Sequence, residues 1–399
     1  MFEKIKLKNL VDLRAGIGFP NKYQGNKNSN IPFYKVGDIS REFQKCNFYI
    51  NNADNYITAE ILAELKGKLF DEGTIIFAKV GEALKLNRRI ILTQKAMIDN
   101  NIFGIKSNNP CLNNKYLFYF LLQYDLGNIC KTGAVPSVNQ SDIYSISIPL
   151  PPTLEEQQEI VDVLDAASEI IRLRTACIES AQSLIPALFQ EMFGDVKNNT
   201  KNWKLCNLND LVYIDRKNIS VNELKSNAYR YIGLEHIEKD TGKILIDLEN
   251  NFNVDLKSNK YYFTNEHVLY GKLRPYLNKV ALPTCDGVCS TDIFPIMPRK
   301  NISNKYFIKY LMSSPYFVQI TSLKTSGANL PRIGTKVLEL IKVICPDIEI
   351  QNQFAAKAQE IEAYIKTQQA ELENAKTMFQ SLLHYAFMGE LTKYLQKSN

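Results

Sequence analysis

Two parts of the chain carry the same pattern of apolar positions, in which apolar side chains recur at alternating steps of four and three residues. In mid-chain the pattern occupies Ile160, Leu164, Ala167, Ile171, Ile178, Ala181, Ile185 and Leu188, with Arg174 at the one polar position. Near the end it occupies Phe354, Ala358, Ile361, Ile365, Leu372, Ala375, Phe379 and Leu382, with Gln368 at the polar position. Each member of the second set lies 194 residues after its counterpart. A period of 3.5 residues predicts two long helices, each with a coiled-coil seam.

Short matching motifs precede both helices in the same order. Residues 77–80 parallel 270–273, and residues 101–105 parallel 292–296. Similarity at a fixed long spacing indicates a duplicated unit of about half the chain. The motifs that match predict a shared scaffold, and the stretches that diverge predict different tasks for the two copies.

The remaining pattern predicts two α+β domains. Runs of β-branched and aromatic residues at 73–78 and 267–270 are typical of strands, and 116–124 and 306–312 are typical of short amphipathic helices. Thr153 with Glu156 predicts a capping box at the start of the first long helix, and Gly194 and Gly389 predict the two helix ends. We therefore expect domains at 1–152 and 196–346 and helices within 153–195 and 347–399.

The two seams can be buried in two ways. Each helix could pack on its own domain, or the helices could pair. The strict heptad spacing favours pairing, and because the domain between the helices must return the chain, we expect an antiparallel coiled coil related by a pseudo-twofold axis. Residues 160–188 would make a rod of roughly 42 Å. Such pairing would bring Arg174 near Gln368, where a hydrogen bond could fix the register.

Charge is unevenly distributed along the chain. The formal net charge is +6 in residues 1–152, −7 in 153–195, +9 in 196–346 and −2 in 347–399. Two basic domains joined by acidic helices suit a polyanion bound at two places. A generally Lys-rich composition explains the same numbers, so charge alone leaves nucleic-acid binding open.

The sequence lacks the motifs of the common catalytic sites. It contains no phosphate-binding G-x-x-x-x-G-K-[ST] loop and no H-E-x-x-H zinc motif, and its three histidines are isolated. The eight cysteines have no regular spacing, and Cys285 and Cys289 lack a second metal-ligating pair nearby. We expect reduced thiols, no metal, no catalytic residue and a cytoplasmic location, since no signal peptide or apolar 18-residue run is present.

Several of these motifs together resemble the specificity subunit of Type I restriction–modification systems. The resemblance covers the whole chain in the order domain, helix, domain, helix. The second copy departs from the pattern, because it has one proline at Pro346 and Ile350 in place of a glutamate, and the first copy has Gly81-Glu82 where the second has Arg274-Pro275. The segments that carry the resemblance are 146–152, 154–160, 193–195 and 271–277, together with Gly133, Ala134 and Pro136.

The resemblance implies a non-catalytic, DNA-binding subunit. Each domain would be a target-recognition domain that reads one half of a split double-stranded DNA sequence. The paired helices would set an unread gap and dock methyltransferase subunits, and restriction subunits would join through the complex. S-adenosylmethionine, ATP and Mg²⁺ would bind the partner subunits and none would bind this chain. Three alternatives stay open: the specificity chain of a fused nuclease–methyltransferase (Type II-like) system, a coiled-coil interaction protein that does not read DNA, and a nuclease whose catalytic site has no recognisable motif.

Basic residues near the family-like segment are the candidate DNA contacts. Arginine can pair with guanine through two hydrogen bonds, and lysine more often neutralises phosphate. Solvated basic loops and surface salt bridges explain such residues equally simply. The candidates are Lys272, Arg274 and Tyr276 in the segment, its repeat equivalent Lys79, the following Lys85, Arg88 and Arg89 in an expected loop, Lys35 and Arg230 beside tyrosines, and Arg332 beside Pro331.

Overall fold

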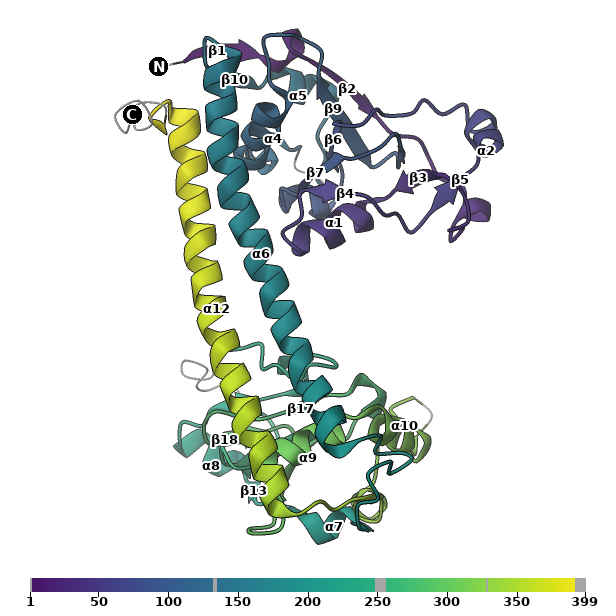
Figure 1. Ribbon diagram of the computed structural model, residues 1–399, viewed down its shortest axis with the longest axis vertical. Coiled ribbons are helices and arrows are strands. Elements are labelled where there is room, and N and C mark those ends of the chain that lie inside the picture. Colours follow the sequence, from purple (N-terminus) through teal and green to yellow (C-terminus); the bar gives the residue numbers. More distant parts are fainter. Residues whose placement is uncertain (1, 132–134, 248–255, 328, 392–399) are drawn as a thin grey trace. The chain divides into compact units, whose positions relative to one another are not determined.

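The computed structural model describes residues 2–131, 135–247, 256–327 and 329–391 (Figure 1). The chain forms two compact units of mixed helix and strand. Unit 1 comprises Met1–Glu179 and Thr367–Asn399, and unit 2 comprises Ser180–Lys366. Both boundaries fall inside long helices, so each unit contains one domain and a part of both helices. Within the described residues, no helix is long and apolar enough to cross a membrane.

Unit 1 is built around a five-stranded sheet of order β2-β9-β6-β7-β4, with a three-stranded sheet β5-β3-β8 beside it and the pair β1-β10. The central strand β6 has the sequence Ile-Ile-Phe-Ala and is buried at every position, which explains why it lacks a polar face. The elements are β1 (Glu3–Lys6), β2 (Val11–Ala15), β3 (Ile31–Tyr34), α1 (Val36–Gln44), β4 (Tyr49–Ile50), β5 (Tyr56–Ile57), α2 (Ala59–Glu64), β6 (Ile75–Ala78), α3 (Glu82–Lys85), β7 (Arg89–Leu92), β8 (Met97–Ile98), β9 (Ile102–Ser107), α4 (Asn114–Gln123), α5 (Gln140–Ser145), β10 (Ser147–Leu150) and α6 (Leu154–Phe193).

Unit 2 contains two four-stranded sheets, of order β12-β19-β16-β17 and β13-β15-β18-β14, and the pair β11-β20. The strands expected at 73–78 and 267–270 correspond to β6 and β16, and the expected short helices correspond to α4 and α9. The elements are β11 (Leu205–Asn207), α7 (Leu208–Leu211), β12 (Val212–Ile214), β13 (Asn218–Ile219), α8 (Val221–Ser226), β14 (Tyr231–Ile232), β15 (Lys260–Phe263), β16 (Val268–Gly271), β17 (Val280–Ala281), β18 (Gly287–Cys289), β19 (Ile293–Pro298), α9 (Lys305–Met312), α10 (Pro315–Leu323), α11 (Thr335–Glu339), β20 (Lys342–Ile344) and α12 (Ile348–Met388).

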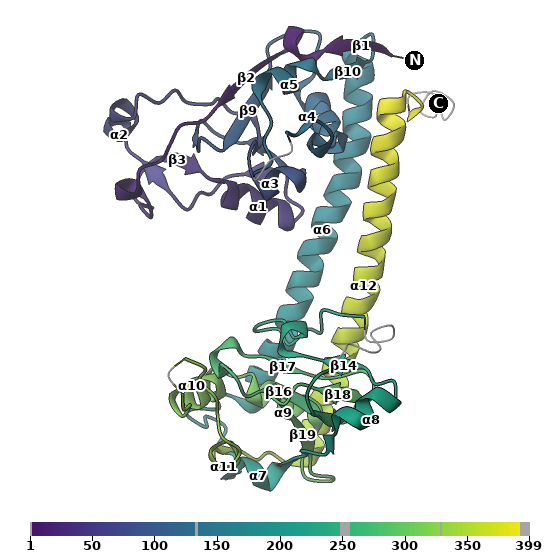
Figure 2. The same ribbon diagram turned by 180° about the vertical axis from the view of Figure 1, so that it is seen from behind.

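The two long helices, α6 and α12, begin and end close to where the sequence predicts (Figure 2). The hydroxyl of Thr153 accepts a hydrogen bond from the Glu156 amide at 3.2 Å, as an N-cap requires. After the last turns, Gly194 and Gly389 have φ of +75° and +74°. A left-handed residue at this place ends a helix, and glycine adopts it without a steric penalty.

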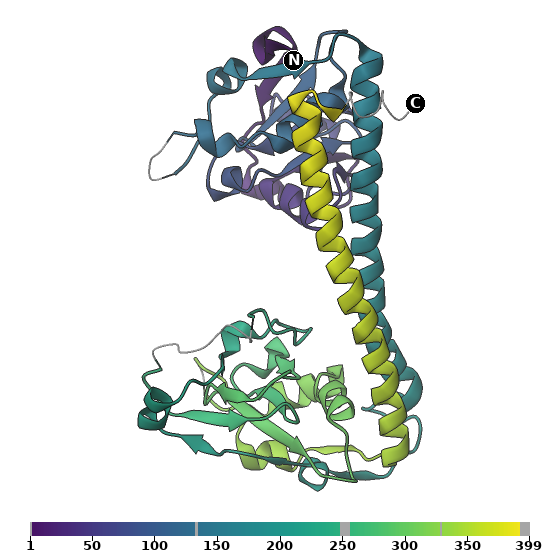
Figure 3. The same cartoon turned by 90° about the vertical axis from the view of Figure 1, so that its left-hand side faces the viewer.

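Within each unit, parts of the long helices pack against the domain. In unit 1 the end of α12 lies beside α6 (Figure 3), and Phe387 lies 5.1 Å from Tyr116 of α4, measured between ring centroids. In unit 2, Phe193 of α6 and Phe354 of α12 are 5.5 Å apart and belong to the same core as Phe307. Both long helices therefore contribute side chains to the core of unit 2, and α12 also packs on α4 in unit 1.

A buried glutamine fixes the first turn of each long helix to its domain. In unit 1 the Gln157 carbonyl accepts from the Asn113 amide at 2.8 Å, and its NH₂ group donates to the Cys111 carbonyl at 2.9 Å. In unit 2 the Gln351 carbonyl accepts from the Asn304 amide at 3.0 Å, and its NH₂ group donates to the Pro346 and Ile302 carbonyls at 2.8 and 3.1 Å. Each glutamine thereby satisfies backbone groups that surround it in the protein interior.

We predict that Gln351→Ala lowers the free energy of unfolding of unit 2 by about 2–4 kcal/mol, because several buried backbone groups lose their partners. Trp203, the one tryptophan, donates to the Phe193 carbonyl at 3.0 Å, so its fluorescence reports this unit during urea denaturation. Gln353→Ala, at an exposed position of the same helix, is the control and should change the value by less than about 0.5 kcal/mol. Equal effects of the two variants would contradict the assignment.

Candidate nucleic-acid interface

The residues that follow strand β16 form a turn, 272–274, held by backbone hydrogen bonds on both sides. The Lys272 amide donates to the Asp292 carbonyl at 2.9 Å, and the Arg274 amide donates to the Pro331 carbonyl at 2.8 Å. The Lys272 carbonyl accepts from the Ile333 amide at 3.1 Å. The turn is therefore fixed between the start of β19 and the segment that leads to α11.

The side chains of this turn and of the residues after it place positive charge and an aromatic ring at the surface. The Lys272 ammonium lies 5.1 Å from the centroid of the Phe294 ring, and burial lowers its pKa although Asp292 opposes the shift. Arg274 is exposed, with φ +52°, and Tyr276 in the following 3-10 turn is half exposed. Four of the predicted residues come together here: Lys272, Arg274, Tyr276 and Arg332.

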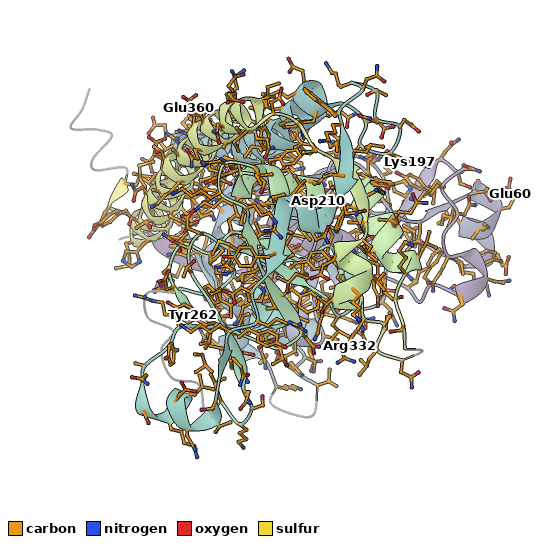
Figure 4. All side chains as sticks on the ribbon, turned by 90° about the horizontal axis from the view of Figure 1, so that it is seen from below. Glu60, Lys197, Asp210, Tyr262, Arg332 and Glu360 are labelled. Atoms are coloured by element: carbon orange, nitrogen blue, oxygen red, sulfur yellow. The ribbon has the colours of Figure 1, made fainter. Side chains whose placement is uncertain are left out.

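Arg332 contacts the turn and the residue before β19 through its backbone and its side chain, respectively. Leu273 and Arg332 form an antiparallel bridge. The Arg332 guanidinium donates from Nε to Asp292 Oδ1 at 3.0 Å and from Nη2 to Oδ2 at 3.4 Å. This ion pair lies at the surface of unit 2, where Figure 4 labels Arg332.

Unit 1 contains a turn, 79–81, with the same backbone hydrogen bonds. The Lys79 amide donates to the Asn101 carbonyl at 2.9 Å, and the Gly81 amide donates to the Pro136 carbonyl at 2.8 Å. The Lys79 carbonyl accepts from the Val138 amide at 3.0 Å. The Lys79 ammonium lies 5.1 Å from the Phe103 centroid, as Lys272 lies from Phe294.

The difference between Gly81 and Arg274 has a conformational explanation. Both residues have positive φ, +82° for Gly81 and +52° for Arg274. Their ψ angles differ, −175° for Gly81 and 64° for Arg274, so Arg274 alone has the left-handed helical conformation. That conformation carries a steric cost for arginine, whereas glycine adopts positive φ freely. Arg274 therefore occupies a backbone conformation that is unfavourable for its residue type, which favours a role for its side chain.

The expected loop at residues 85–89 is confirmed only for 86–88, which include Arg88 and connect α3 to β7. Lys85 ends helix α3, where it pairs with Glu82 at 2.9 Å, Arg88 is half buried, and Arg89 begins strand β7. Only 1% of Arg89 is exposed, and its Nη2 donates to Asn87 at 3.0 Å and to the Tyr124 carbonyl at 3.1 Å. Burial lowers its pKa to about 9, so it is charged at neutral pH. Because its guanidinium is enclosed, Arg89 is removed from the DNA-contact candidates.

Lys35 and Arg230 lie next to strands β3 and β14 and not at the two turns. Lys35 follows β3, and its ammonium is 5.3 Å from the Phe19 centroid. Arg230 precedes β14, and its carbonyl accepts from the Val288 amide at 2.8 Å. Their part in binding stays a prediction. Of the family-like motif, Gly133 and Ala134 and the matching Ala328 lie outside the described residues.

Asp292 is the residue that reasoning from the sequence missed. It belongs to the motif at 292–296, which was interpreted only as scaffold. The signal was available, because the other copy has Asn101 at the matching place, so this position of the shared motif differs in charge between the copies. In the parts of the chain that the structure describes, no three metal-ligating side chains gather into a site.

Comparisons with known proteins find one family. Residues 1–181 match the family model described as the Type I restriction modification DNA specificity domain. The chain is 25% identical over 393 residues to the Type I restriction enzyme EcoDI specificity subunit of Escherichia coli, covering 88% of this chain and 86% of the relative. It is 22% identical to the MjaVIII specificity subunit of Methanocaldococcus jannaschii, covering 76% of each. The chain is a relative of Type I specificity subunits.

Solved structures share the fold. The Type I restriction–modification S subunit of M. genitalium has a TM-score of 0.56 at 13% identity, covering 97% of this chain and 96% of that one. A structure described as the basis of complex assembly and conformational transition of the type I R-M system has a TM-score of 0.57 at 16% identity, covering 98% of both chains. The resemblance of the sequence to Type I specificity subunits is confirmed.

We predict that Arg89 affects stability and not binding. Arg89→Ala should lower the free energy of unfolding of unit 1 by about 2–4 kcal/mol, because it leaves a cavity and an unpaired Tyr124 carbonyl. Lys85→Ala, at an exposed position, should change it by less than about 0.5 kcal/mol. Urea denaturation followed by circular dichroism measures both values. A wild-type stability for Arg89→Ala would show that the enclosed guanidinium contributes nothing.

Proposed function

We propose that this chain is the DNA specificity subunit of a Type I restriction–modification system and that it has no catalytic activity of its own. Each unit reads one half of a bipartite double-stranded target. The observation that carries the proposal is the pair of turns, 79–81 and 272–274, which share their backbone hydrogen bonds and the lysine above a phenylalanine. A lysine held in the same way in both units suits contact with a DNA phosphate at two places.

The side chains around the turns differ, and this supports two different half-sequences. Unit 2 has Arg274 and Arg332 where unit 1 has Gly81 and Ser137. Phosphate contacts position a protein on DNA, whereas hydrogen bonds to base edges specify the sequence. Both units would therefore use the equivalent lysine to contact a phosphate, and the different side chains beside it would read a different half-sequence in each unit.

The long helices set the gap between the half-sites. The chain passes from one unit to the other only within α6 and α12. In unit 1, Arg174 Nη1 donates to Gln368 Oε1 at 3.0 Å and also pairs with Glu371. This polar contact in an otherwise apolar seam supports an antiparallel coiled coil with a pseudo-twofold relation between its helices, in which Arg174 and Gln368 fix the register.

Apolar residues on the outer faces of the helices support the docking of methyltransferase subunits. In unit 1, Ile170 and Leu173 of α6 and Met378 and Tyr385 of α12 are exposed, although they lie in the helical part that also forms the seam. Exposed apolar side chains that recur along a helix are typical of a surface that a partner covers. Restriction subunits join through this complex, and S-adenosylmethionine, ATP and Mg²⁺ belong to the partners.

Alanine at Lys272 or Arg274 tests the proposal. The probe is the duplex that the wild-type chain, assembled with its methyltransferase subunits, selects from a randomised library. Each variant should weaken binding about 10- to 100-fold, and loss of a phosphate contact should reduce the slope of log K against log salt by about 1. Lys366→Ala, at an exposed position of α12, is the control for a lost positive charge. Wild-type affinity and salt slope in both turn variants would refute the assignment of the site.

A further inference from the structure

In the Asp292–Arg332 ion pair, the carboxylate contacts one edge of the guanidinium and does not contact the edge at the end of the side chain. The carboxylate takes hydrogen bonds from Nε at 3.0 Å and from Nη2 at 3.4 Å, so it meets the guanidinium from the side. A guanidinium has five N–H donors in a planar fork. Two face the carboxylate, and one N–H of Nη1 together with the second N–H of Nη2 points outward from the end of the side chain.

The ion pair contributes little to holding the fold together. The Arg332 and Asp292 side chains are 40% and 28% exposed, and water weakens an ion pair at so exposed a position. The backbones are fixed without it, because Arg332 exchanges two hydrogen bonds of 2.9 Å with Ser326, and the Asp292 carbonyl accepts from Lys272. The backbones of Arg332 and Asp292 are therefore each held by hydrogen bonds of their own, and their side chains meet at the surface.

Unit 1 shows that the scaffold does not need this pair. There Asn101 takes the place of Asp292 and Ser137 takes the place of Arg332, and the backbone hydrogen bonds are the same. The Lys131 amide donates to the Ser137 carbonyl at 2.9 Å, as the Ser326 amide donates to the Arg332 carbonyl. The residue types at both positions differ between the copies, whereas the backbone hydrogen bonds around them are the same. The ion pair is therefore a feature of unit 2 that unit 1 lacks.

The surroundings favour a base edge over a phosphate as the ligand of Arg332. Arg332 and Arg216 each lie close enough to Lys272 to lower its pKa. Lys272 and Arg216 can therefore supply positive charge for the DNA backbone beside Arg332. A carboxylate next to Arg332 would repel a phosphate. It would not repel the uncharged O6 and N7 acceptors of guanine, which accept two hydrogen bonds from the end of an arginine.

We propose that Arg332 reads one guanine in the half-site bound by unit 2 and that Asp292 is the positioning residue that orients the guanidinium for it. This inference rests on the proposed function, and it deepens that function by naming the base and the residues that recognise it. Unit 1, with Asn101 and Ser137, lacks this reader.

The test is selection from a randomised duplex library by the chain assembled with its methyltransferase subunits. The wild-type complex should enrich a bipartite motif with an invariant guanine in one half. Arg332→Lys and Asp292→Asn should reduce the preference for that guanine about 10- to 100-fold and leave the other positions unchanged. The double variant Asp292→Asn with Arg332→Ser installs the pair that unit 1 carries on the same frame, so it keeps the fold and should lose the same position.

A matched control is Arg299→Lys, since Arg299 is another arginine of unit 2 whose Nε donates to the Asn209 carbonyl at 2.9 Å. It should keep the full motif. An unchanged guanine preference in the double variant would overturn the inference, and an equal loss at every position would identify Arg332 as a phosphate contact and overturn it too. Failure of the wild-type complex to enrich any motif would instead refute the proposed function, and the inference with it.

Discussion

One buried amide side chain fastens the first turn of each long helix to a domain, in addition to the apolar packing around it. Gln157 and Gln351 lie 194 residues apart and bond the loop before α4 and the loop before α9, respectively. A glutamine offers a donor and an acceptor at once, so it can satisfy a buried amide and a buried carbonyl from the same helix position. A helix can set the spacing of a recognition surface only if the domain cannot rotate on it, and this contact prevents such rotation at the first turn.

We assign DNA recognition to two sets of groups in each unit: a backbone frame that both units share, and side chains on that frame that differ between the units. The frame comprises the strand end, the turn and the returning segment, which are joined by the same hydrogen bonds in both units. Lys79 and Lys272 belong to the frame, whereas Arg274, Asp292 and Arg332 belong to unit 2 alone. A protein built in this way can change what one unit reads without altering its fold, because exposed side chains on a rigid backbone contribute little to stability.

The sequence predicted the helices, their ends and the α+β character of the domains, because period and capping are local signals. It failed at Arg89, which was expected in a loop and lies on a buried strand, because local sequence does not report which charged side chain a sheet encloses. It also failed to identify Asp292, since its contact with Arg332 joins residues 40 positions apart. The glutamine contacts were hidden for the same reason, although the motif that contains Gln157 was recognised.

Removal of one heptad from each long helix tests the central claim most directly. Residues 175–181 and 361–367 are suitable, because each stretch contains a boundary between the two units. Seven residues correspond to about 10 Å of helix, or about three base pairs of B-DNA. Methylome sequencing of cells that carry the shortened chain and its partner subunits should show the same two half-sequences with a gap about three base pairs shorter. The same target with an unaltered gap would contradict the account.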